Sequence, residues 1–406
     1  MLVLIHPSKT IIGEKSKRLV GKKVILGIAS SAAIYRSIDL ARELMRHGAE
    51  VYVVMTNEAV KLISPEMFKW ATGNLVLVDL TGDIEHISYT YDDQKNTIMV
   101  IAPATANTMT KLSLGIADNA LLTTALSAMG NEIPLIVVPA MHLSMWNSPQ
   151  IKKTISKLKE IGVEIVEPYV IGDKAKYPPN AEIVEYIFRA FTPKNLSEKK
   201  VVVSAGATRI YIDDIRFISN PSSGKMGIAM ALEAWLRGAE VTLILSKSAS
   251  SVVVPRDINI VSFETYEEAK EALLKYTESC DVFIHAAAIS DFKPVRKFEG
   301  KIKSGKSLEL ILEPTEKILE LVAKKQKAMY VIAFKAEWRK TDDELAESAK
   351  EYIESGEANA VVANDVSRHI FGSDETDVIL VYKDRDITKI RLTGLKREVA
   401  GRILDL

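Results

Sequence analysis

Residues 216–227, RFISNPSSGKMG, form the segment of this chain that is best suited to bind an anion. They follow an apolar run, 201–204, that reads as a strand, and they lead into a helical pattern at 228–237. Small residues between a strand and a helix let backbone N–H groups approach a phosphate or carboxylate at the positive end of the helix. The side chains of Asn220 and Lys225 add donors there. Taken alone, the same residues also fit an ordinary helix N-cap beside a lysine.

The first half of the chain places small or polar residues directly after four apolar runs that read as strands. Open α/β sheets bind ligands at the carboxyl ends of their strands, where hydroxyls and backbone N–H groups can hold a phosphate. Each segment alone reads equally well as a helix cap, but four that converge on one edge favour a binding site. The segments are 29–33, 55–56, 102–107 and 139–142, with Ser30, Ser31 and Thr56 as candidate phosphate ligands.

The spacing of apolar residues predicts that strands and helices alternate through both halves of the chain. Such alternation implies parallel sheets with right-handed crossovers. We therefore expect an α/β protein with two tandem domains, each built on a mainly parallel sheet. These are a flavodoxin-like or Rossmann-like domain over 1–190, a linker at 191–198, and a Rossmann-like domain over 199–406. The predicted strands are 24–28, 51–55, 97–101, 135–138, 201–204, 241–245, 282–286, 330–334 and 360–363, and the predicted helices are 34–47, 119–128, 226–237, 267–276, 316–325 and 343–355.

Composition restricts the partners and the compartment. The chain has 53 basic and 53 acidic residues, so its net charge gives no general attraction to nucleic acid or to a membrane surface. A single cysteine, Cys280, excludes an intrachain disulfide framework and a cysteine-based metal site. No apolar run approaches the ~20 residues that span a bilayer, and the amino-terminal residues do not read as a signal peptide. We expect a cytoplasmic protein that binds neither nucleic acid nor membrane.

The first half, from about 22 to 189, resembles the flavin-dependent cysteine decarboxylases, specifically phosphopantothenoylcysteine decarboxylase. The motifs that carry the resemblance are APATANTMTKLSLGIADN at 102–119, the histidine of IEHI at 84–87, and PAMHLSMW at 139–146. The resemblance implies that His86 is the catalytic base and that His142 and Met145 contact the substrate. It also implies bound FMN, which serves as the redox cofactor for loss of CO₂. The FMN-binding positions are Ser30, Ser31, Thr56, Ala104, Thr105, Ala106 and Asn107.

Two positions depart from the decarboxylase pattern. His142 stands where the family usually has an asparagine at the substrate carboxylate, although imidazole can still donate a hydrogen bond. The lid segment, 172–177, lacks the cysteine that usually supplies the final proton. Lys174, Lys176, Tyr177 or water are the alternative donors, and Lys174 is preferred because it follows the glycine–aspartate turn that carries the usual donor. Without that cysteine, this half could also be a non-catalytic flavoprotein.

The second half, from about 199 to 406, resembles phosphopantothenate–cysteine ligase. The motifs are AGATR at 205–209, the 216–227 segment, AAAISD at 286–291, KIK at 301–303 and ANDV at 363–366, together with Asp213 and Phe334. The family activates the carboxylate of 4′-phosphopantothenate with CTP, releases pyrophosphate, and lets the amine of cysteine displace CMP from the acyl-cytidylate.

This resemblance implies roles for individual residues. Lys301 offsets the charge of the triphosphate, and Asn220 donates its amide to the acyl-cytidylate; the alternatives are a solvated lysine and an N-cap. Arg216 and Lys225 contact substrate, and Asp291 can hold Mg²⁺. The segment TEKI at 315–318 departs from the usual Asn-Pro-Asp-Ile. The preference of the ligase for CTP over ATP is therefore left open. The CTP-binding positions are His285, Ala286, Ala287, Asp291, Lys301, Thr315, Glu316, Lys317, Ile318 and Phe334.

Together the two resemblances predict a bifunctional enzyme of coenzyme A biosynthesis, archaeal-like, that acts on 4′-phosphopantothenate, cysteine and CTP. The families form trimers through the flavin half and dimers through the ligase half, so a large homo-oligomer, such as a dodecamer, is expected. A nicotinamide-dependent oxidoreductase with two Rossmann-like halves is the other alternative. It is disfavoured because neither opening turn carries the spaced glycine triplet of dinucleotide-binding folds.

Overall fold

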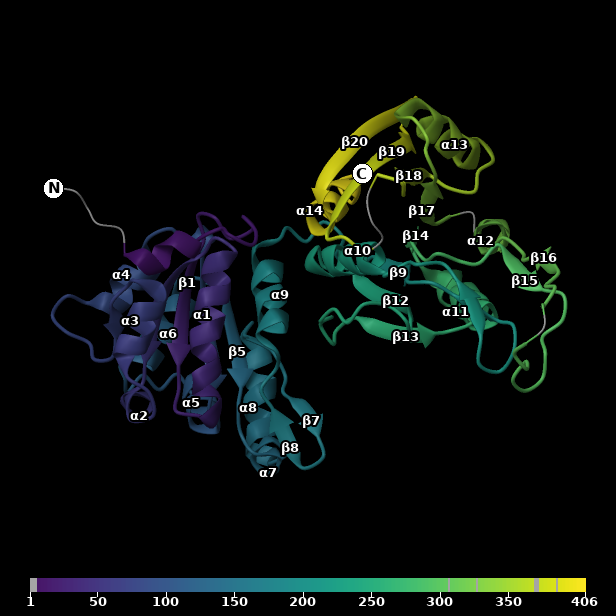
Figure 1. Cartoon of the computed structure of the whole chain (residues 1–406). Helices are drawn as coiled ribbons and strands as arrows, with labels where there is room; N and C mark the ends of the chain where they lie inside the picture. The colour runs from purple at the N-terminus through teal and green to yellow at the C-terminus, as the bar shows by residue number, and fades with distance from the viewer. Residues whose placement is uncertain (1–5, 306, 326–327, 369–371, 385) are drawn as a thin grey trace. The chain divides into compact units, whose positions relative to one another are not determined.

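The computed structural model describes residues 6–305, 307–325, 328–368, 372–384 and 386–406; within these, the side chain of Lys174 is not described. The chain divides into two compact units, Met1–Thr192 and Pro193–Leu406 (Figure 1). Helix α9 (Asn180–Phe191) closes the first unit, and strand β9 (Lys200–Ala205) opens the sheet of the second. No helix of the described residues is both long enough and apolar enough to cross a membrane.

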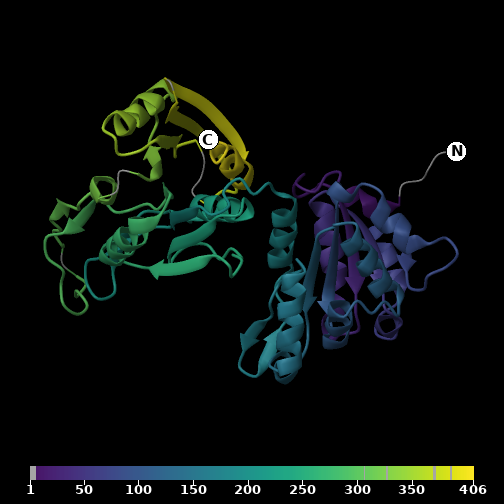
Figure 2. The ribbon, with the colours of Figure 1, turned by 180° about the vertical axis from the view of Figure 1, so that it is seen from behind.

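The first unit is built on a six-stranded parallel sheet with the order β3-β2-β1-β4-β5-β6. β4 is buried at every residue and β1 at all but its first, so the sheet is covered on both faces. Opposite views show helices in front of the sheet from either side (Figures 1 and 2). The strands are β1 (Lys23–Ile28), β2 (Glu50–Met55), β3 (Val76–Leu77), β4 (Thr97–Ala104), β5 (Leu135–Pro139) and β6 (Glu164–Ile165).

The helices of the first unit form two groups by their mutual contacts. In one group, α1 packs against α3 and α9. In the other, α5 packs against α6 and α8, and α6 also packs against α4. Most begin at a serine, threonine or asparagine whose side chain accepts a backbone N–H bond. The helices are α1 (Arg36–Arg46), α2 (Asn57–Val60), α3 (Pro65–Thr72), α4 (Glu85–Tyr91), α5 (Ala106–Ser113), α6 (Ala120–Gly130), α7 (Leu143–Trp146), α8 (Pro149–Glu160) and α9.

The second unit is built on an eight-stranded sheet with the order β13-β12-β9-β14-β17-β18-β19-β20. The pairs from β13 to β18 are parallel, whereas β19 pairs antiparallel with β18 and β20 antiparallel with β19. The antiparallel extension was not predicted. Besides β9, the strands are β12 (Glu240–Ser246), β13 (Asn259–Phe263), β14 (Val282–His285), β17 (Tyr330–Glu337), β18 (Ala360–Asp365), β19 (Glu375–Lys383) and β20 (Ile387–Leu395).

Five helices cover this sheet, and α10 is central because it packs against α14, β9 and β12. Ten of its twelve residues are buried, which explains its lack of a polar face. Capping boxes at Thr265 and Thr341 begin α11 and α13. The helices are α10 (Lys225–Leu236), α11 (Tyr266–Tyr276), α12 (Ile318–Lys325), α13 (Asp342–Glu354) and α14 (Lys396–Ile403).

The structure confirms the α/β class, the parallel sheets and every predicted strand and helix, with shifted ends. It corrects one local expectation, because the strand predicted at 97–101 continues through Ala104. It also adds a strand that was not predicted, β10 (Arg209–Tyr211), which pairs with β11 (Phe217–Ser219). Two further short hairpins join β7 (Tyr169–Ile171) to β8 (Lys174–Lys176) and β15 (Phe292–Pro294) to β16 (Leu312–Pro314).

Gly227 in α10 lets the helix lie directly on β9, and this close approach can be tested. A Cβ added at Gly227 would lie 2.6 Å from the Cβ of Ala205 and 2.8 Å from the carbonyl oxygen of Ser204. We expect Gly227→Ala to lower the stability of the second unit by about 1–3 kcal/mol, because packed backbone must shift. Gly401→Ala is the matched helical control, since its Cβ would meet only the flexible end of Glu233 at 3.4 Å. Equal urea midpoints for the two variants would contradict the packing argument.

Two candidate active sites

The first unit brings its four predicted segments together at one edge of the sheet. They follow the neighbouring strands β2, β1, β4 and β5. Backbone bonds continue across the strand ends, from Thr56 N to Ile28 O at 3.1 Å and from Ala140 N to Ala104 O at 2.9 Å. The chain runs from β1 to β2 on one side and places β4 on the other, so the β1–β4 boundary is the topological switch point at which such sheets bind ligands.

The hydroxyl groups at this edge act as helix caps. Ser31, Thr56 and Thr105 each accept a bond from a backbone N–H two or three residues later, at 3.1–3.3 Å. The capping interpretation is therefore correct for these three side chains. Among the described residues, the hydroxyl of Ser30 and the exposed amide of Asn107 have no hydrogen-bond partner. They remain available to a ligand beside the unpaired N–H groups that begin α5.

Ala104 and Ala106 lie beneath these polar groups. Ala104 is fully buried as the last residue of β4, and Ala106, the first residue of α5, is 9% exposed. Sequence reasoning placed Ala104 in a loop, and the structure places it in the strand. Their small side chains offer a ligand only backbone and methyl groups.

His86 is the second residue of α4, directly after Ile84 and Glu85, and Ile84 has a left-handed backbone with φ of 47°. The backbone carbonyl of His86 accepts a bond from Thr90 Oγ1 at 2.8 Å. Its ring nitrogen Nδ1 is buried with no hydrogen-bond partner in the described part of the chain. Among the described residues, no hydrogen bond ties the ring to the four carboxyl-edge segments, so the ring is not held at that edge by a hydrogen bond.

His142 and Met145 lie just beyond β5, at the same edge as the other segments. His142 occupies the N-cap position of α7 with an exposed ring that caps nothing. Met145 is 46% exposed, whereas the neighbouring Trp146 is buried at 5% and anchors the short helix. Both predicted substrate contacts therefore face outward beside the end of β5.

The lid segment forms the β7–β8 hairpin, whose base is attached to the first unit at two points. Arg36 donates to the carbonyl of Tyr177 at 3.0 Å, and the hydroxyl of Tyr169 donates to Glu182 at 2.7 Å. The hydroxyl of Tyr177 is buried without a partner among the described residues, and burial raises its pKa above the ordinary range. Tyr177 therefore holds its proton tightly and is a poor candidate for the missing donor. The side chain of Lys174 lies outside the described structure.

Cys280 belongs to the second unit, where it is 8% exposed and burial raises its pKa to about 11. Its sulfur lies 3.7 Å from that of Met329. The residue therefore packs as a small buried hydrophobe.

In the second unit, the loops after β9 and β14 are joined beyond the ends of their strands. Ala288 N donates to Gly206 O at 2.8 Å, and Ser290 N donates to Thr208 Oγ1 at 2.9 Å. β12 and β13 lie on one side of β9 and β14 lies on the other, so this boundary is again a topological switch point. The predicted motifs AGATR and AAAISD therefore meet at one place.

The 216–227 segment, which leads into α10, also lies beside the loop after β9. Gly224 is the N-cap of α10 with a left-handed φ of 73°, and a Cβ there would lie 3.0 Å from Gly206 N. Only glycine fits this contact without strain. Asn220, four residues earlier, is exposed, and its amide has no hydrogen-bond partner in the described residues.

Two predicted substrate contacts are bound within the protein. The guanidinium of Arg216 donates to Asp213 at 2.5 Å and to the carbonyl of Ile302 at 3.2 Å. Lys225 donates to Asp374 at 2.7 Å and to the carbonyl of Gly372. Each side chain would have to share or exchange these partners to bind a substrate.

Residues predicted to bind the nucleotide surround the ends of β14 and β17. His285 pairs with Ala333 in the sheet register, which puts Phe334 beside Ala286, next to Ala287. Burial lowers the pKa of His285 to about 4, so its ring is neutral at pH 7, and its Nδ1 lies 2.9 Å from Ser204 Oγ. The neutral ring adds no positive charge for the phosphates.

Asp291, in the loop after β14, and residues 315–317, just before α12, are held by hydrogen bonds and ion pairs. Thr315 Oγ1 donates to Ser290 O at 2.7 Å. Asp291 forms an ion pair with Lys317, and Glu316 forms one with Lys270. Ile318, the first residue of α12, is 2% exposed, and its side chain packs in the hydrophobic core. No group of three or more His, Cys, Asp or Glu suited to a metal occurs among the described residues.

Lys301 lies on an exposed loop, and its ammonium has no hydrogen-bond or ion-pair partner in the described part of the chain. The flanking residues are held: Gly300 N donates to Asp214 at 2.8 Å and Ile302 N donates to Asp213 at 3.1 Å. Sequence reasoning noted Asp213 without giving it a role, and it overlooked Glu264, which accepts bonds from Arg209 and Tyr211 at 2.7 Å. Only the folded chain reveals these long-range carboxylate contacts.

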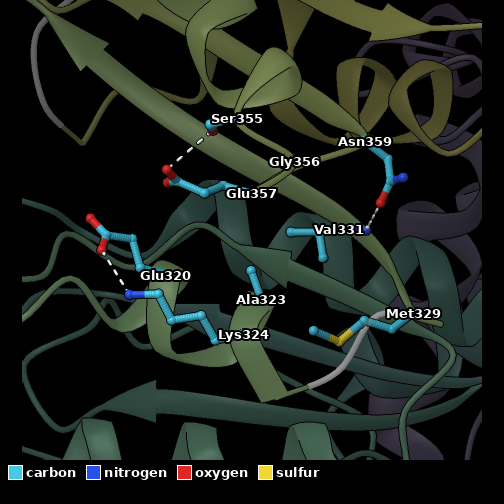
Figure 3. Close-up of a pocket in the computed structure, with 9 residues that line it drawn as sticks. All are labelled: Glu320, Ala323, Lys324, Met329, Val331, Ser355, Gly356, Glu357 and Asn359. Atoms are coloured by element: carbon cyan, nitrogen blue, oxygen red, sulfur yellow. Dashed lines mark hydrogen bonds and ion pairs between the residues drawn. The ribbon is translucent and has the colours of Figure 1, made fainter.

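A surface hollow of about 470 Å³ lies away from these residues, where β17 and β18 begin (Figure 3). The ion pair Glu320–Lys324 of α12 and the bond from Ser355 to Glu357 after α13 lie along it. None of the predicted site residues lines it. It is therefore separate from both carboxyl-edge sites.

Comparison with known proteins agrees with both halves of this description. Residues 12–192 match the family described as Flavoprotein, and residues 196–406 match the DNA/pantothenate metabolism flavoprotein C-terminal domain. The chain is 44% identical to the coenzyme A biosynthesis bifunctional protein CoaBC of Thermococcus kodakarensis, over 99% of this chain and 98% of that one. It is 39% identical to CoaBC of Methanocaldococcus jannaschii, over 99% and 97%, and 32% identical to CoaBC of Bacillus subtilis, over 90% and 92%. These similarities along the whole chain show that it belongs to the family of bifunctional CoaBC proteins of coenzyme A biosynthesis.

Proposed function

We propose specific reactions for the two activities of this coenzyme A biosynthesis enzyme, a ligase and a decarboxylase. The second unit joins 4′-phosphopantothenate to cysteine with CTP, and the first unit decarboxylates the product to 4′-phosphopantetheine with FMN. The product of one site is the substrate of the other, which accounts for one chain with two units. The observation that carries the proposal is the convergence, in each unit, of the family motifs on the switch point of a parallel sheet.

The residues at the carboxyl edge of the first unit fit a flavin phosphate. Ser30 and Asn107 retain free polar groups beside the N-terminus of the eight-residue helix α5, and Ala104 and Ala106 leave room for close approach. FMN, when bound, supplies the oxidising and reducing equivalents that make loss of CO₂ feasible. Ser31, Thr56 and Thr105 act by fixing the loops through their caps.

In decarboxylation, His86 accepts a proton from the substrate as the general base. His142 donates a hydrogen bond to the substrate carboxylate before it leaves, beside Met145. The last proton comes from Lys174 of the β7–β8 hairpin, because burial keeps the proton on Tyr177.

In ligation, Lys301 offsets the charge of the triphosphate while the carboxylate of 4′-phosphopantothenate attacks the α-phosphorus and pyrophosphate leaves. Asn220 then holds the acyl-cytidylate as the amine of cysteine attacks its carbonyl carbon and CMP leaves. Asp291 would hold Mg²⁺, which would offset the charge of the phosphates, and to do so it must exchange its ion pair with Lys317. Arg216 and Lys225 keep the surrounding segments in place and contribute charge.

The nucleotide base lies against Phe334 and the loop at 285–287, where the ring of His285 is neutral. We propose CTP as the nucleotide and a homo-oligomer as the working form, with trimeric flavin units and dimeric ligase units. Comparing CTP with ATP in the ligation assay, and measuring the mass of the assembly by light scattering, tests these two points.

The proposed base can be removed without touching the ligase unit. We expect His86→Ala to slow CO₂ release by roughly 10²–10⁴-fold, because a positioned general base contributes about that much. Ligation by the same variant should stay near the wild-type rate, and its flavin absorbance should be unchanged. His142→Asn is a second variant that restores the usual family residue and should still release CO₂. Wild-type decarboxylation by His86→Ala, or a wild-type protein without flavin, would contradict the assignment.

The two ligase roles separate in a pyrophosphate assay without cysteine. We expect Lys301→Gln to reduce pyrophosphate release by roughly 10²–10³-fold, because the variant loses the ammonium proposed to offset the triphosphate charge. Asn220→Ala should still release pyrophosphate but form little ligated product. Lys303→Gln, an exposed lysine two residues from Lys301, is the matched control and should behave as wild type. The reverse pattern would exchange the two roles.

A further inference from the structure

Asp213 has a completely buried carboxylate that accepts bonds from two segments far apart in the sequence. Its oxygens accept from the backbone N–H groups of Ile215 at 2.8 Å and Arg216 at 2.6 Å, and from the guanidinium of Arg216 at 2.5 Å. They also accept from the backbone N–H of Ile302 at 3.1 Å. One carboxylate therefore joins the turn before β11 to the loop that carries Lys301.

Further contacts hold this loop on both sides of Lys301. Arg216 donates to the carbonyl of Ile302 at 3.2 Å, so Asp213 and Arg216 grip both backbone groups of that residue. On the other side, Gly300 and Asp214 exchange two bonds, at 2.8 and 3.3 Å. Lys301 thus projects from a backbone that is fixed immediately before and after it.

The same turn leads directly to Asn220. β11 begins at Phe217, the residue after Arg216, and pairs with β10. Ser219, the last residue of β11, donates through its hydroxyl to the carbonyl of Thr208 at 2.9 Å, in the loop after β9. The next residue is Asn220. A short, hydrogen-bonded stretch therefore connects Asp213 to Asn220 and fixes the backbone that carries the Asn220 side chain.

The carboxylate is charged under all working conditions and is fully engaged. Hydrogen bonds led by the backbone N–H of Arg216 hold the pKa of Asp213 far below its usual range, against the effect of burial. Its two oxygens already accept four bonds. It is therefore neither a proton acceptor for the reaction nor a free ligand for a cation.

We propose that Asp213 is a positioning residue of the ligation, a clamp that fixes the Lys301 loop against the strand that leads to Asn220. Formation of the acyl-cytidylate and its reaction with cysteine then both take place with Lys301 and Asn220 held in one fixed arrangement. The kinetic part of this inference rests on the proposed roles of Lys301 and Asn220, whereas the clamp itself is a property of the fold.

The clamp is tested first by limited trypsin digestion of the full chain, with cleavage after Lys301 and Lys303 followed by mass spectrometry. We expect Asp213→Asn to raise cleavage at these sites roughly tenfold or more, because an amide cannot accept all four bonds and the loop detaches locally. Asp281→Asn is the matched control, since Asp281 accepts a backbone bond from Lys200 at 2.8 Å at the other edge of the same sheet. Unchanged cleavage in Asp213→Asn overturns the clamp.

Hydrogen exchange of the wild-type chain covers the case in which Asp213→Asn does not fold. The amide of Ile302 should exchange more slowly than that of Lys303, which follows it in the same loop, because only the former is bonded to a buried carboxylate. Equal exchange at the two amides overturns the clamp without any variant.

The kinetic arm uses a double-mutant cycle on pyrophosphate release without cysteine. We expect Asp213→Asn to lower kcat about 10–100-fold for both this step and the cysteine-dependent step, because displaced catalytic groups lose that much. In the Lys301→Gln background, Asp213→Asn should add little to the loss of pyrophosphate release. Fully additive losses overturn the positioning role. Normal ligation by Lys301→Gln itself overturns the proposed function, and proteolysis then still decides whether the clamp exists.

Discussion

The polar backbone groups at the carboxyl ends of buried parallel strands determine where both candidate sites lie. Each sheet is covered by helices, so its interior is apolar, and β4 has no exposed residue at all. Where neighbouring strands lead to opposite sides, at β1–β4 and at β9–β14, the connections diverge and leave room between them. Small residues and helix N-termini lie there in both units, which is why the candidate site falls at the same edge of each sheet.

Hydrogen bonds within the loops decide which side chains remain available. Ser31, Thr56 and Thr105 are used as caps, and Arg216 and Lys225 are bound to carboxylates. The predicted site groups that the described structure leaves without partners include Ser30, Asn107 and the ring nitrogen Nδ1 of His86 in one unit, and Asn220 and Lys301 in the other. In both units, several polar residues of the motifs are used to hold the loops, and the unpartnered ones are the candidates for contact with substrate or cofactor.

The apolar pattern of the sequence predicted nine of the strands and six of the helices, because burial of parallel strands and one-sided helices leaves a strong periodic signal. It did not predict β19 and β20, which extend the second sheet antiparallel, nor the short strand β10. The short β10 and the half-exposed β20 leave a weak signal because few of their side chains are buried, whereas β19 contains a buried apolar run at 378–381 that was a usable signal. Ile318 shows the same limit at the level of the site, since a motif position does not reveal whether a side chain faces ligand or core.

The sequence by itself determined the family resemblance, the α/β class and the motifs, because these depend on residue type and local spacing. Only the tertiary structure decided which residues meet. Asp213 and Ile302 are 89 residues apart, and no local sequence pattern indicates that the carboxylate of Asp213 accepts a bond from the backbone N–H of Ile302. The same holds for Gly224 and Gly206, whose close contact depends on how α10 packs on β9. Contacts between distant segments arise from packing of the whole unit, and the local sequence does not encode them in a readable form.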